Sequence, residues 1–208
     1  MSHVSVLKQI EKSMKFSDMV VSPCERKEIK DFIEKWHYSK NMNGVISTYC
    51  FKLECKGKLI GAMVFGWLAM ANTWKKYVNK KEELIELRRL CCIDDTPKNT
   101  ESFFIGKCLR WLKTNTKVKK IVSYADPEFN HQGIIYQATH FQNLGTTAES
   151  QVILWNGKRY HGKTIRSYYN GKLKPYAIKL REALESGEAH YETTKGKHIY
   201  LYTLRETW

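Results

Sequence analysis

The spacing of hydrophobic residues along the chain predicts an alternation of helices and strands. We expect helices, each with apolar side chains three or four positions apart, at residues 25–36, 101–114 and 176–184. We expect strands, seen as short apolar or alternating runs, at residues 45–55, 59–65, 84–93, 152–155 and 198–204. No internal repeat or low-complexity linker separates them. The pattern therefore predicts one α/β domain over residues 1–208, with a basic C-terminal part from about residue 156.

The strand expected at residues 84–93 carries a charge on a face that is otherwise apolar. Period-two alternation places Arg89 on the same face as Leu87 and Cys91. An unpaired guanidinium is costly in such a place. Either a buried acid pairs with Arg89, or this end of the strand lines a ligand site. Arg88, on the other face, is expected to be a solvated surface charge.

The stretch 119–141 is expected to form a strand, a tight turn with a carboxylate and a helix. The apolar run ends at Asp126-Pro127, because proline cannot extend a strand. Asn130 is the expected N-cap of the helix, with Tyr136 on its rim. The expected buried stripe of the helix is Ile134, Ile135, Ala138 and Phe141. Ligands of α/β folds bind beyond the carboxyl ends of strands, which makes Asp126 a candidate functional residue. The alternative is that Asp126 caps the helix or closes a turn.

The charge of the chain indicates the class of its partner. Lysine and arginine number 35 against 21 aspartates and glutamates, which gives a formal charge of +14. Such an excess favours a polyanion. Nucleic acid is favoured over a membrane surface, because no segment joins a basic face to a continuous apolar face. No apolar run approaches the roughly 20 residues of a membrane span, and no secretory signal is evident, so we expect a cytoplasmic protein.

The six cysteines do not form a recognisable metal or redox pattern. No C-x-x-C pair occurs, and His37 has no second histidine at ligand spacing, so we expect no metal site. Cys91 and Cys92 lie within a strand-like run and are interpreted as small core residues. A catalytic cysteine is the less favoured alternative.

The most basic stretch follows Asn156-Gly157 and contains the pattern G-x-x-x-x-G-K-T at residues 157–164. A phosphate-binding loop is disfavoured, because its interior positions must let backbone amides wrap the phosphates and here they are bulky. A basic, aromatic loop that grips a nucleic-acid backbone or stacks on a base suits these residues better, with an ordinary solvated loop as the alternative. The candidate DNA-binding residues are Lys158, Arg159, Tyr160, Lys163 and Arg166.

The sequence Asp-Pro-Glu-Phe at residues 126–129 partly resembles the Asp-Pro-Pro-Tyr/Phe motif of adenine amino-methyltransferases. There the carboxylate hydrogen bonds the amine that is modified, and the aromatic ring stacks on the flipped base. No G-x-G occurs in this chain to hold S-adenosylmethionine, so the similarity indicates a shared task rather than a shared cofactor. The candidate substrate-binding residues are Tyr38, Phe129, Asn130 and His131.

Several stretches taken together resemble the Mom family of bacteriophage DNA-modification enzymes. They are W-H-Y-S-K, E-L-R-R-L-C-C-I-D-D-T-P-K-N-T-E-S-F-F-I-G, S-Y-A-D-P-E-F-N-H-Q-G-I-I-Y-Q-A-T-H-F, N-G-K-R-Y-H-G-K-T and K-G-K-H-I-Y-L-Y-T-L. The resemblance implies a fold similar to the GCN5-related N-acyltransferases (GNAT): a mixed, mostly antiparallel sheet flanked by helices. It also implies conversion of adenine in DNA to N6-(carbamoylmethyl)adenine, which shields phage DNA from restriction. The positions that match the family's active site are His37, Arg89, Ser102, Asp126 and Tyr136.

The resemblance suggests roles for these residues. Asp126 would accept a hydrogen bond from the adenine amine, and Arg89 would stabilise developing charge or hold the donor. Tyr136 would be the acid for the leaving group, Ser102 would position the donor, and His37 would act as a base or a substrate contact. The rival functions are a coenzyme A-dependent N-acetyltransferase of another substrate and a non-catalytic, basic DNA-binding or anti-restriction protein.

The expected cofactor loop departs from the wider acyltransferase pattern. Those enzymes hold the coenzyme A pyrophosphate with a glycine-rich turn before a helix, whereas residues 94–99 here contain no glycine. The acyl donor is therefore either a glycyl-tRNA-like ester or a coenzyme A thioester. The expected partners are double-stranded DNA and, for the first donor, tRNA. A monomer and a homodimer fit equally well.

Overall fold

The computed structural model describes residues 14–69, 72–129 and 131–206. They form two compact units. The first contains the described residues through Tyr124 together with Gly133–Leu144 and those from Ile199 onward. The second contains Ala125–Gln132 and Gly145–His198. Each unit has its own sheet, and whether they behave as the single domain expected from the sequence stays a prediction.

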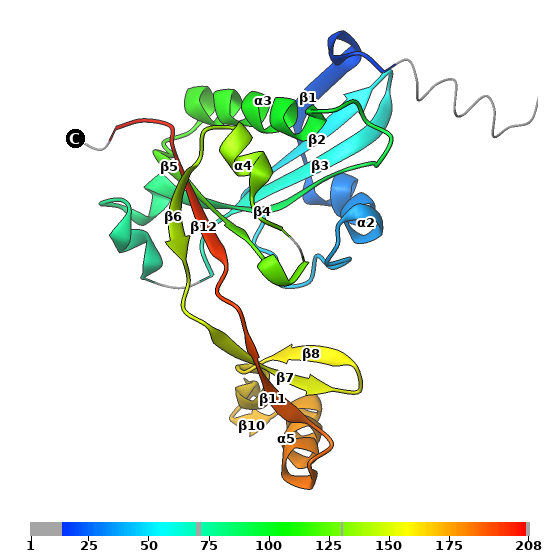
Figure 1. The fold of residues 1–208 in the computed structure, drawn as a ribbon, viewed down its shortest axis with the longest axis vertical. Coiled ribbons are helices and arrows are strands. Elements are labelled where there is room, and N and C mark those ends of the chain that lie inside the picture. The colour runs from blue at the N-terminus through cyan, green and yellow to red at the C-terminus, as the bar shows by residue number, and fades with distance from the viewer. Residues whose placement is uncertain (1–13, 70–71, 130, 207–208) are drawn as a thin grey trace, which may run out of the picture. The chain divides into compact units, whose positions relative to one another are not determined.

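A seven-stranded sheet forms the centre of the first unit, in the order β1-β2-β3-β4-β5-β12-β6 (Figure 1). Its strands are β1 (Met19–Cys24), β2 (Tyr49–Cys55), β3 (Lys58–Gly66), β4 (Leu84–Cys92), β5 (Lys120–Ala125), β12 (His198–Thr203) and β6 (Gln142–Thr146). The pairs from β1 to β4 are antiparallel, and β4 pairs with β5 in parallel. The expected mixed, mostly antiparallel sheet is confirmed.

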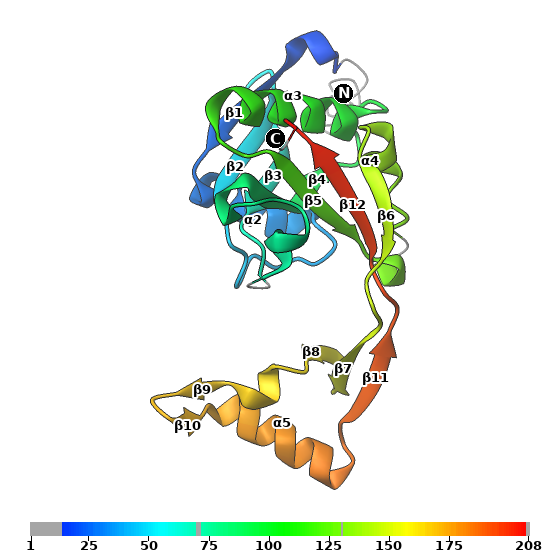
Figure 2. The same ribbon diagram turned by 90° about the vertical axis from the view of Figure 1, so that its left-hand side faces the viewer.

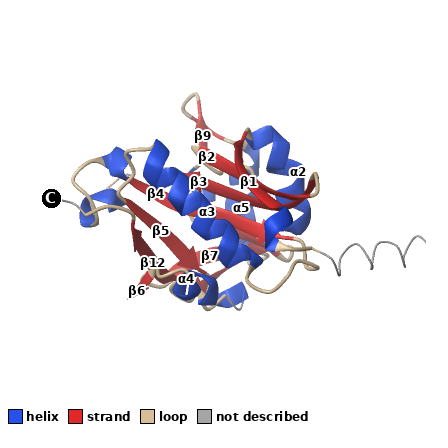
Figure 3. Ribbon diagram, turned by 90° about the horizontal axis from the view of Figure 1, so that it is seen from above, coloured by secondary structure: helices blue, strands red, loops and turns tan. Residues whose placement is uncertain are grey.

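Two helices cover opposite faces of this sheet (Figure 3). They are α2 (Arg26–Trp36) and α3 (Thr100–Asn115), both at the positions that hydrophobic spacing predicted. Successive strand residues point to opposite faces. Cys50 and Val64 therefore pack under α2, whereas Phe51 and Phe65 face α3, where the Phe51 ring lies 5.2 Å from Trp111. Short 3-10 turns η1 (Phe16–Asp18), η2 (Thr73–Lys76) and η3 (Lys81–Glu83) complete the unit together with a short helix α4 (Ile134–Ala138).

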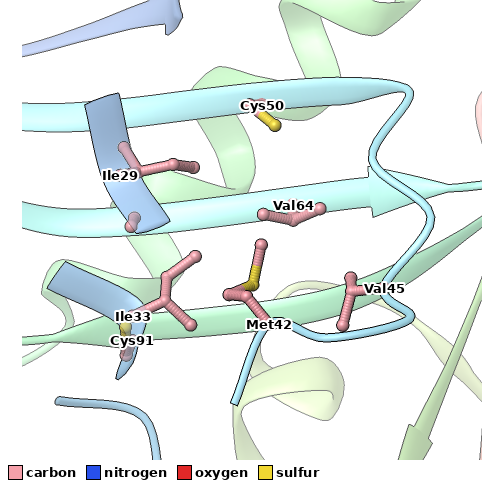
Figure 4. Packing of buried hydrophobic residues seen from close by; sticks show 8 residues of the cluster. Ile29, Ile33, Met42, Val45, Cys50, Val64 and Cys91 are labelled. Carbon is pink, nitrogen blue, oxygen red and sulfur yellow. The ribbon is translucent and has the colours of Figure 1, made fainter. Parts of the chain in front are cut away.

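The core under α2 shows why this helix forms where it does. Ile29 and Ile33 are fully buried against Met42, Val64 and their neighbours on β3 and β4 (Figure 4). Burying one such aliphatic side chain contributes about 1.5–3 kcal/mol, so the two isoleucines fix the helix on the sheet. Arg26, in the first turn of the helix, donates to Val45 O at 2.6 Å and to Met42 O. It thereby ties down the loop that follows the helix.

A β-bulge in β4 overturns the alternation expected for this strand. Val64 pairs with Arg89, but the next residue of β3, Phe65, pairs with Leu87, which leaves Arg88 as the extra residue. Since Val64 and Phe65 face opposite sides of the sheet, Arg89 and Leu87 do as well. The prediction that Arg89 shares the face of Leu87 is therefore wrong, although Arg89 does share its face with Cys91. Nothing in the local sequence indicates the extra residue.

Arg88 is not the solvated charge that the sequence suggested. Its side chain is largely buried, and its Nη1 donates to Glu86 Oε2 at 2.9 Å and to Trp67 O at 3.1 Å. These two acceptors, which the sequence pattern did not assign to Arg88, hold its charge inside the protein. A buried pair of this kind is costly to break, because one charge would be left without a partner.

The helix after the Asp126 turn is shorter than expected. Gly133, with φ of +72°, precedes α4, which covers only five residues. The predicted cap, Asn130, lies outside the described residues. The expected buried stripe is also wrong at Ile134, which is 72% exposed, and at Ala138, which is exposed as well, although Phe141 is buried. The chain leaves the helix early because Phe141 N–H bonds back to Tyr136 O at 2.9 Å.

Replacing Gly133 with alanine should destabilise the protein strongly. An added Cβ would lie 2.2 Å from Cε2 of Tyr200, which is itself buried, and the left-handed backbone at this position is also unfavourable for alanine. We expect a loss of about 2–4 kcal/mol in the free energy of unfolding, measured by denaturant titration. Gly44→Ala is the matched control, because Gly44 has a similar φ of +69° with no atom near its Cβ position. Equal losses in the two variants would contradict the steric explanation.

The second unit has a three-stranded antiparallel sheet in the order β11-β7-β8 (Figure 2). Its elements are η4 (Pro127–Phe129), β7 (Ser150–Trp155), β8 (Lys158–His161), η5 (Thr164–Arg166), β9 (Tyr168–Tyr169), β10 (Lys172–Leu173), α5 (Pro175–Ser186) and β11 (His190–Thr194). Helix α5 buries Leu180 and Ala183 against Ile153 of β7. This small core is separate from that of the first unit.

The stretch after Asn156-Gly157 is a strand rather than a loop at its start. Asn156 and Gly157 have φ of +49° and +69°, the geometry of a two-residue hairpin turn, and β8 pairs with β7 beyond them. Residues 158–161 therefore form an extended edge strand beside β7. Extended backbone of this kind is a second argument against a phosphate-binding loop, whose amides must curl around the phosphates.

Candidate functional site

Pairing between the two central strands stops partway along both. The parallel register runs from Leu84 opposite Lys120 to Leu87 opposite Ser123, and β4 then continues along β3 alone. Ser123 is fully buried and donates its hydroxyl to Leu87 O at 3.3 Å. Carboxyl ends of central strands are the usual place for ligands in α/β folds. Arg89 follows this point directly.

Arg89 is held by main-chain carbonyls rather than by an acid. Its Nη1 donates to Arg88 O at 2.7 Å, and its Nη2 and Nε make longer contacts with Asn41 O at 3.3 and 3.4 Å. Burial lowers the pKa of Arg89, and the proximity of Tyr38 acts in the opposite direction. No carboxylate of the described residues forms an ion pair with Arg89. Of the two alternatives drawn from the sequence, the structure favours a ligand-facing arginine.

Tyr136 belongs to α4 and its ring packs in a cluster of aromatic side chains. The ring lies 5.2 Å from that of Tyr200 and 5.5 Å from that of Phe141, and its hydroxyl hydrogen bonds with Ser123. Burial raises the pKa of Tyr136, with Ser123 opposing that shift and Tyr38 adding to it. A tyrosine is protonated at neutral pH even at its ordinary pKa, so Tyr136 can act as a proton donor, although the raised pKa makes its hydroxyl a weaker acid.

His37 and Tyr38 directly follow helix α2, with His37 as its C-cap. The backbone N–H of Ser39 donates to Nδ1 of His37 at 3.1 Å, so the neutral ring carries its proton on Nε2. The His37 side chain is buried, and its ring lies 4.3 Å from that of the exposed Tyr38. This tautomer makes His37 Nε2 a hydrogen-bond donor. Substrate contact or donation therefore fits His37 better than the role of a base.

Ser102 stands in the first turn of α3 and is partly buried. Helix α3 packs against α4, the helix of Tyr136. In the part of the chain that the structure describes, no contact joins the Ser102 side chain to the other predicted residues. Tyr38 is near enough to Arg89 and to Tyr136 to affect the pKa of both, and its ring contacts that of His37, whereas no such link joins Ser102 to them among the described residues.

Asp126 belongs to the second unit, and both of its carboxylate oxygens are engaged. Oδ1 accepts from Glu128 N–H at 3.1 Å, which closes the turn after Pro127, and Oδ2 lies 2.9 Å from Nζ of Lys197. The structure therefore supports the alternative that Asp126 closes a turn. A carboxylate has about four lone-pair sites, so these two contacts leave others for an amine.

A second acidic residue of this turn anchors it to the three-stranded sheet. Glu128 pairs with Arg159 of β8 and accepts from Lys195 N–H at 3.2 Å, and Arg159 also lies 2.8 Å from Glu192 of β11. The hydrogen bond with Glu128 is the main reason that the pKa of Arg159 is raised. Arg159 was a candidate for DNA binding, and the structure gives its charge two internal partners instead.

The remaining candidates divide into exposed and packed residues. Phe129 and His131 are exposed beside Asp126, and Asn130 lies outside the described residues. Among the basic candidates of this stretch, Lys158, Arg159, Lys163 and Arg166 all have exposed side chains, and Arg159 is the one paired with carboxylates. Tyr160 packs on Trp155, at 6.1 Å between ring centroids, and joins the core of the second unit.

Burial makes two of the cysteines poorly reactive. Burial raises the pKa of Cys91 to about 12 and that of Cys92 further, which makes reactive thiolates unfavourable there. In residues 14–69, 72–129 and 131–206 no group of three potential ligand side chains is placed to hold a metal ion. Among the same residues, no helix is long and apolar enough to span a membrane.

Sequence reasoning missed the residues that contact the candidate site residues in each of the two units. Ser123 had a signal, because a hydroxyl in the middle of the apolar run I-V-S-Y-A is unusual on a buried strand. Tyr200 and Lys197 had none, since each reaches its partner from a segment more than 60 positions away in the chain. Such pairings depend on topology that local patterns do not contain.

Two sets of known proteins are similar to this chain. A methylcarbamoylase mom from Escherichia phage Mu is 27% identical over 165 residues, which cover 77% of this chain and 66% of that protein, just under two thirds of its length. A mutant of the spermidine N-acetyltransferase SpeG from Vibrio cholerae superposes with a TM-score of 0.50 and 12% identity, covering 90% of this chain and 95% of that one. An N-acetyltransferase from Staphylococcus aureus Mu50 also gives 0.50 and 12%, covering 90% and 99%.

The likeness to solved acetyltransferases concerns the fold alone and confirms the GNAT-like architecture that the sequence resemblance implied. The family comparison extends further along the chain. The model of the Mom protein family matches residues 18–208, a range that includes every predicted site residue. This chain belongs to the Mom protein family.

Proposed function

We propose that this protein is a DNA-modification transferase that converts adenine in double-stranded DNA to N6-(carbamoylmethyl)adenine and so protects phage DNA from restriction in the host cytoplasm. The observation that carries the proposal is the family match over residues 18–208. The charge of +14 supports it, because the substrate is a polyanion. A duplex base would have to be flipped before its amine could react, at a cost of a few kcal/mol.

In this proposal Arg89 acts on the donor. Its guanidinium lacks an acidic partner among the described residues, and burial lowers its pKa, so a negative charge beside it would be stabilised strongly. A carbonyl oxygen that becomes an oxyanion during acyl transfer is such a charge. Tyr136, which is protonated at neutral pH, would then give its proton to the leaving group.

Asp126 is the proposed acceptor for the adenine N6–H. The lone pairs that Glu128 N–H and Lys197 leave unused can receive the amine hydrogen and orient the nitrogen for attack. Phe129, which is exposed in the same turn, is the proposed stacking partner of the base. Both roles are carried over from the resemblance of this turn to that of adenine amino-methyltransferases.

Of the two donors left open by the sequence, we propose the one without coenzyme A, because the turn before α3 lacks features that bind a pyrophosphate. The glycine that would let backbone amides wrap a pyrophosphate is absent there, and Asp94 and Asp95 are both exposed just before the helix. Glu101 adds a third carboxylate in the first helical turn. Carboxylates near a bound pyrophosphate would repel it, by about 1 kcal/mol per pair at 4 Å in bulk water, and the exposed Lys98 of the same turn would offset one of the three.

A glycyl ester, such as the one at the end of an aminoacyl-tRNA, supplies the required atoms. Adenine N6 would attack the ester carbonyl and release the ribose hydroxyl, which gives an N6-glycyl amide. The glycyl amine would then attack ring carbon six and displace the original nitrogen, which becomes the carboxamide. The product is adenine with N–CH2–CO–NH2 at carbon six, and no oxidant or reductant is needed.

The donor proposal predicts which mixture yields product. Purified protein, double-stranded DNA and glycyl-tRNA should give carbamoylmethyladenine, measured by mass spectrometry of the digested DNA. With ¹⁵N-glycine on the tRNA, the label should appear at the nitrogen attached to carbon six. Product formed from DNA and acetyl-coenzyme A, without tRNA, would contradict this donor.

The basic residues of the second unit should differ in their effect on DNA binding. Replacing the exposed Lys163 with glutamine should weaken duplex binding and lower the slope of log K against log salt by about 0.9, as expected for one lost phosphate contact. Replacing Arg159 with glutamine should leave the slope unchanged and lower stability instead, because Glu128 and Glu192 would lose their partner. An unchanged slope in the Lys163→Gln variant would contradict its phosphate contact.

A further inference from the structure

The hairpin β9–β10 and the start of α5 expose three large aromatic side chains that have no part in the proposed function. Tyr168, Tyr169 and Tyr176 are 56%, 70% and 48% exposed, within nine positions of one another. Single exposed aromatics are ordinary, but a group of them on a small module marks an interaction surface. We call these three tyrosines, with Lys172 and Lys174 between them, the tyrosine platform.

The platform rests on backbone that is fixed in place. Asn170 and Gly171 have φ of +49° and +74°, as a two-residue hairpin turn demands, and Tyr169 pairs with Lys172 across it. Lys174 N–H continues the ladder by donating to Ser167 O at 2.9 Å, and Pro175 then begins α5. The rings therefore project from a preorganised support, which reduces the entropy lost on binding.

An open pocket of about 600 Å³ lies on this platform. Its lining includes Tyr169, Lys172, Leu173, Pro175 and Tyr176, so that aromatic and apolar surface alternates with lysine. Pockets for small molecules and nucleotides commonly measure 300–1,000 Å³. A planar ring linked to a negatively charged group suits this lining better than an aliphatic or cationic ligand does.

The charge around the platform identifies the partner further. Between Glu149 and Glu182 the chain contains no acidic residue, whereas eight lysines and arginines occur there. Two of these eight are engaged inside the unit: Arg159 by two carboxylates and Arg181 by Ile165 O at 2.8 Å. The other six basic residues make the surface around the exposed tyrosines positively charged. Lysine next to exposed tyrosine is the composition that binds single-stranded nucleic acid.

We propose that the tyrosine platform binds a short stretch of unpaired DNA. A base stacks on Tyr169 or Tyr176, and Lys172 and Lys174 contact the neighbouring phosphates. The inference rests on the proposed function, since an enzyme that modifies an adenine amine must open the duplex around its target, and unpaired nucleotides then become available. The platform differs in this respect from Lys158, Lys163 and Arg166, whose charges suit the backbone of a duplex.

The experiment measures binding of the full-length chain to a labelled 12-nucleotide single strand by fluorescence anisotropy, with the corresponding duplex alongside. Tyr169→Ala and Tyr176→Ala should each weaken single-strand binding by roughly 5-fold or more, and Tyr169→Phe should keep it, because stacking needs the ring and not the hydroxyl. Tyr191→Ala is the matched control: Tyr191 is 50% exposed on β11 of the same unit and should bind as wild type does.

Several results would overturn the inference. These are unchanged single-strand binding in both alanine variants, an equal loss in Tyr191→Ala, and equally strong competition by a polyglutamate peptide. Tighter binding of RNA of the same sequence would overturn the assignment to DNA. Circular dichroism of each variant separates lost binding from lost folding. A chain that binds the single strand through Tyr169 and Tyr176 yet modifies no adenine would keep this inference and contradict the proposed function.

Discussion

Replacing Asp126 with asparagine should abolish adenine modification, by a factor of roughly 10²–10⁴, while the protein still folds and binds DNA. Asparagine keeps a side-chain oxygen that can accept from Glu128 N–H and so close the turn. It lacks the negative charge that would attract and orient the adenine amine. The measurement is the fraction of modified deoxyadenosine in plasmid DNA, with duplex binding determined in parallel.

Lys197 provides the control that separates chemistry from scaffolding at this position. Lys197→Met removes the ion pair with Asp126 but leaves the carboxylate in place. If Asp126 matters only as half of that pair, the two variants should lose activity equally. We expect Lys197→Met to retain most of the activity, and the pair itself to contribute about 1 kcal/mol or less to stability. A non-catalytic binding protein, in turn, would protect DNA equally well with Asp126 or Asn at this position.

Replacing Arg89 with methionine should lower modification by a factor of roughly 10²–10³, the cost of removing one donor to a developing oxyanion. The loss of stability should be small. Arg89 contacts only main-chain carbonyls, two of its contacts exceed 3.2 Å, and no described acid would be left without its partner. Arg89→Lys should recover part of the activity, because it keeps the charge without the planar fork.

Arg26 is the matched control for Arg89, since both arginines hold the loop after α2 through main-chain carbonyls. Arg26 donates to Val45 O and Met42 O, whereas Arg89 donates to Asn41 O. Arg26→Gln should therefore lower the melting temperature more than Arg89→Met does, and should lower activity less. The reverse order would show that Arg89 acts by tethering this loop, and its proposed role would be wrong.

The parts of the fold that local patterns determine were predicted well. Helices α2 and α3 and strands β2 to β5 lie close to the positions that the spacing of hydrophobic residues predicted. The reason is that the buried face of a helix or strand depends on residues that are close together in the sequence. The turn at Asn156-Gly157 was located as well, although the strand β8 after it was taken for a loop. The GNAT-like arrangement itself came from the family resemblance, not from periodicity.

The parts that depend on long-range contacts could not be predicted in the same way. The extra residue Arg88 in β4 is fixed by its pairing with β3, and it reversed the face assigned to Arg89 relative to Leu87. Helix α4 is short because Gly133 must approach Tyr200, which lies on the last strand. Arg159 seemed to be a solvated cation, because Glu128 and Glu192 are more than 30 positions away from it.

The measurement that tests the central claim most directly is mass spectrometry of nucleosides from plasmid DNA after this chain alone is expressed in bacteria. The proposed function predicts deoxyadenosine that carries a carbamoylmethyl group, and its absence in the Asp126→Asn variant. An acetylated or methylated deoxyadenosine would keep the substrate and contradict the proposed product. Unmodified DNA from cells that contain folded protein would contradict the claim that this chain by itself is the modifying enzyme.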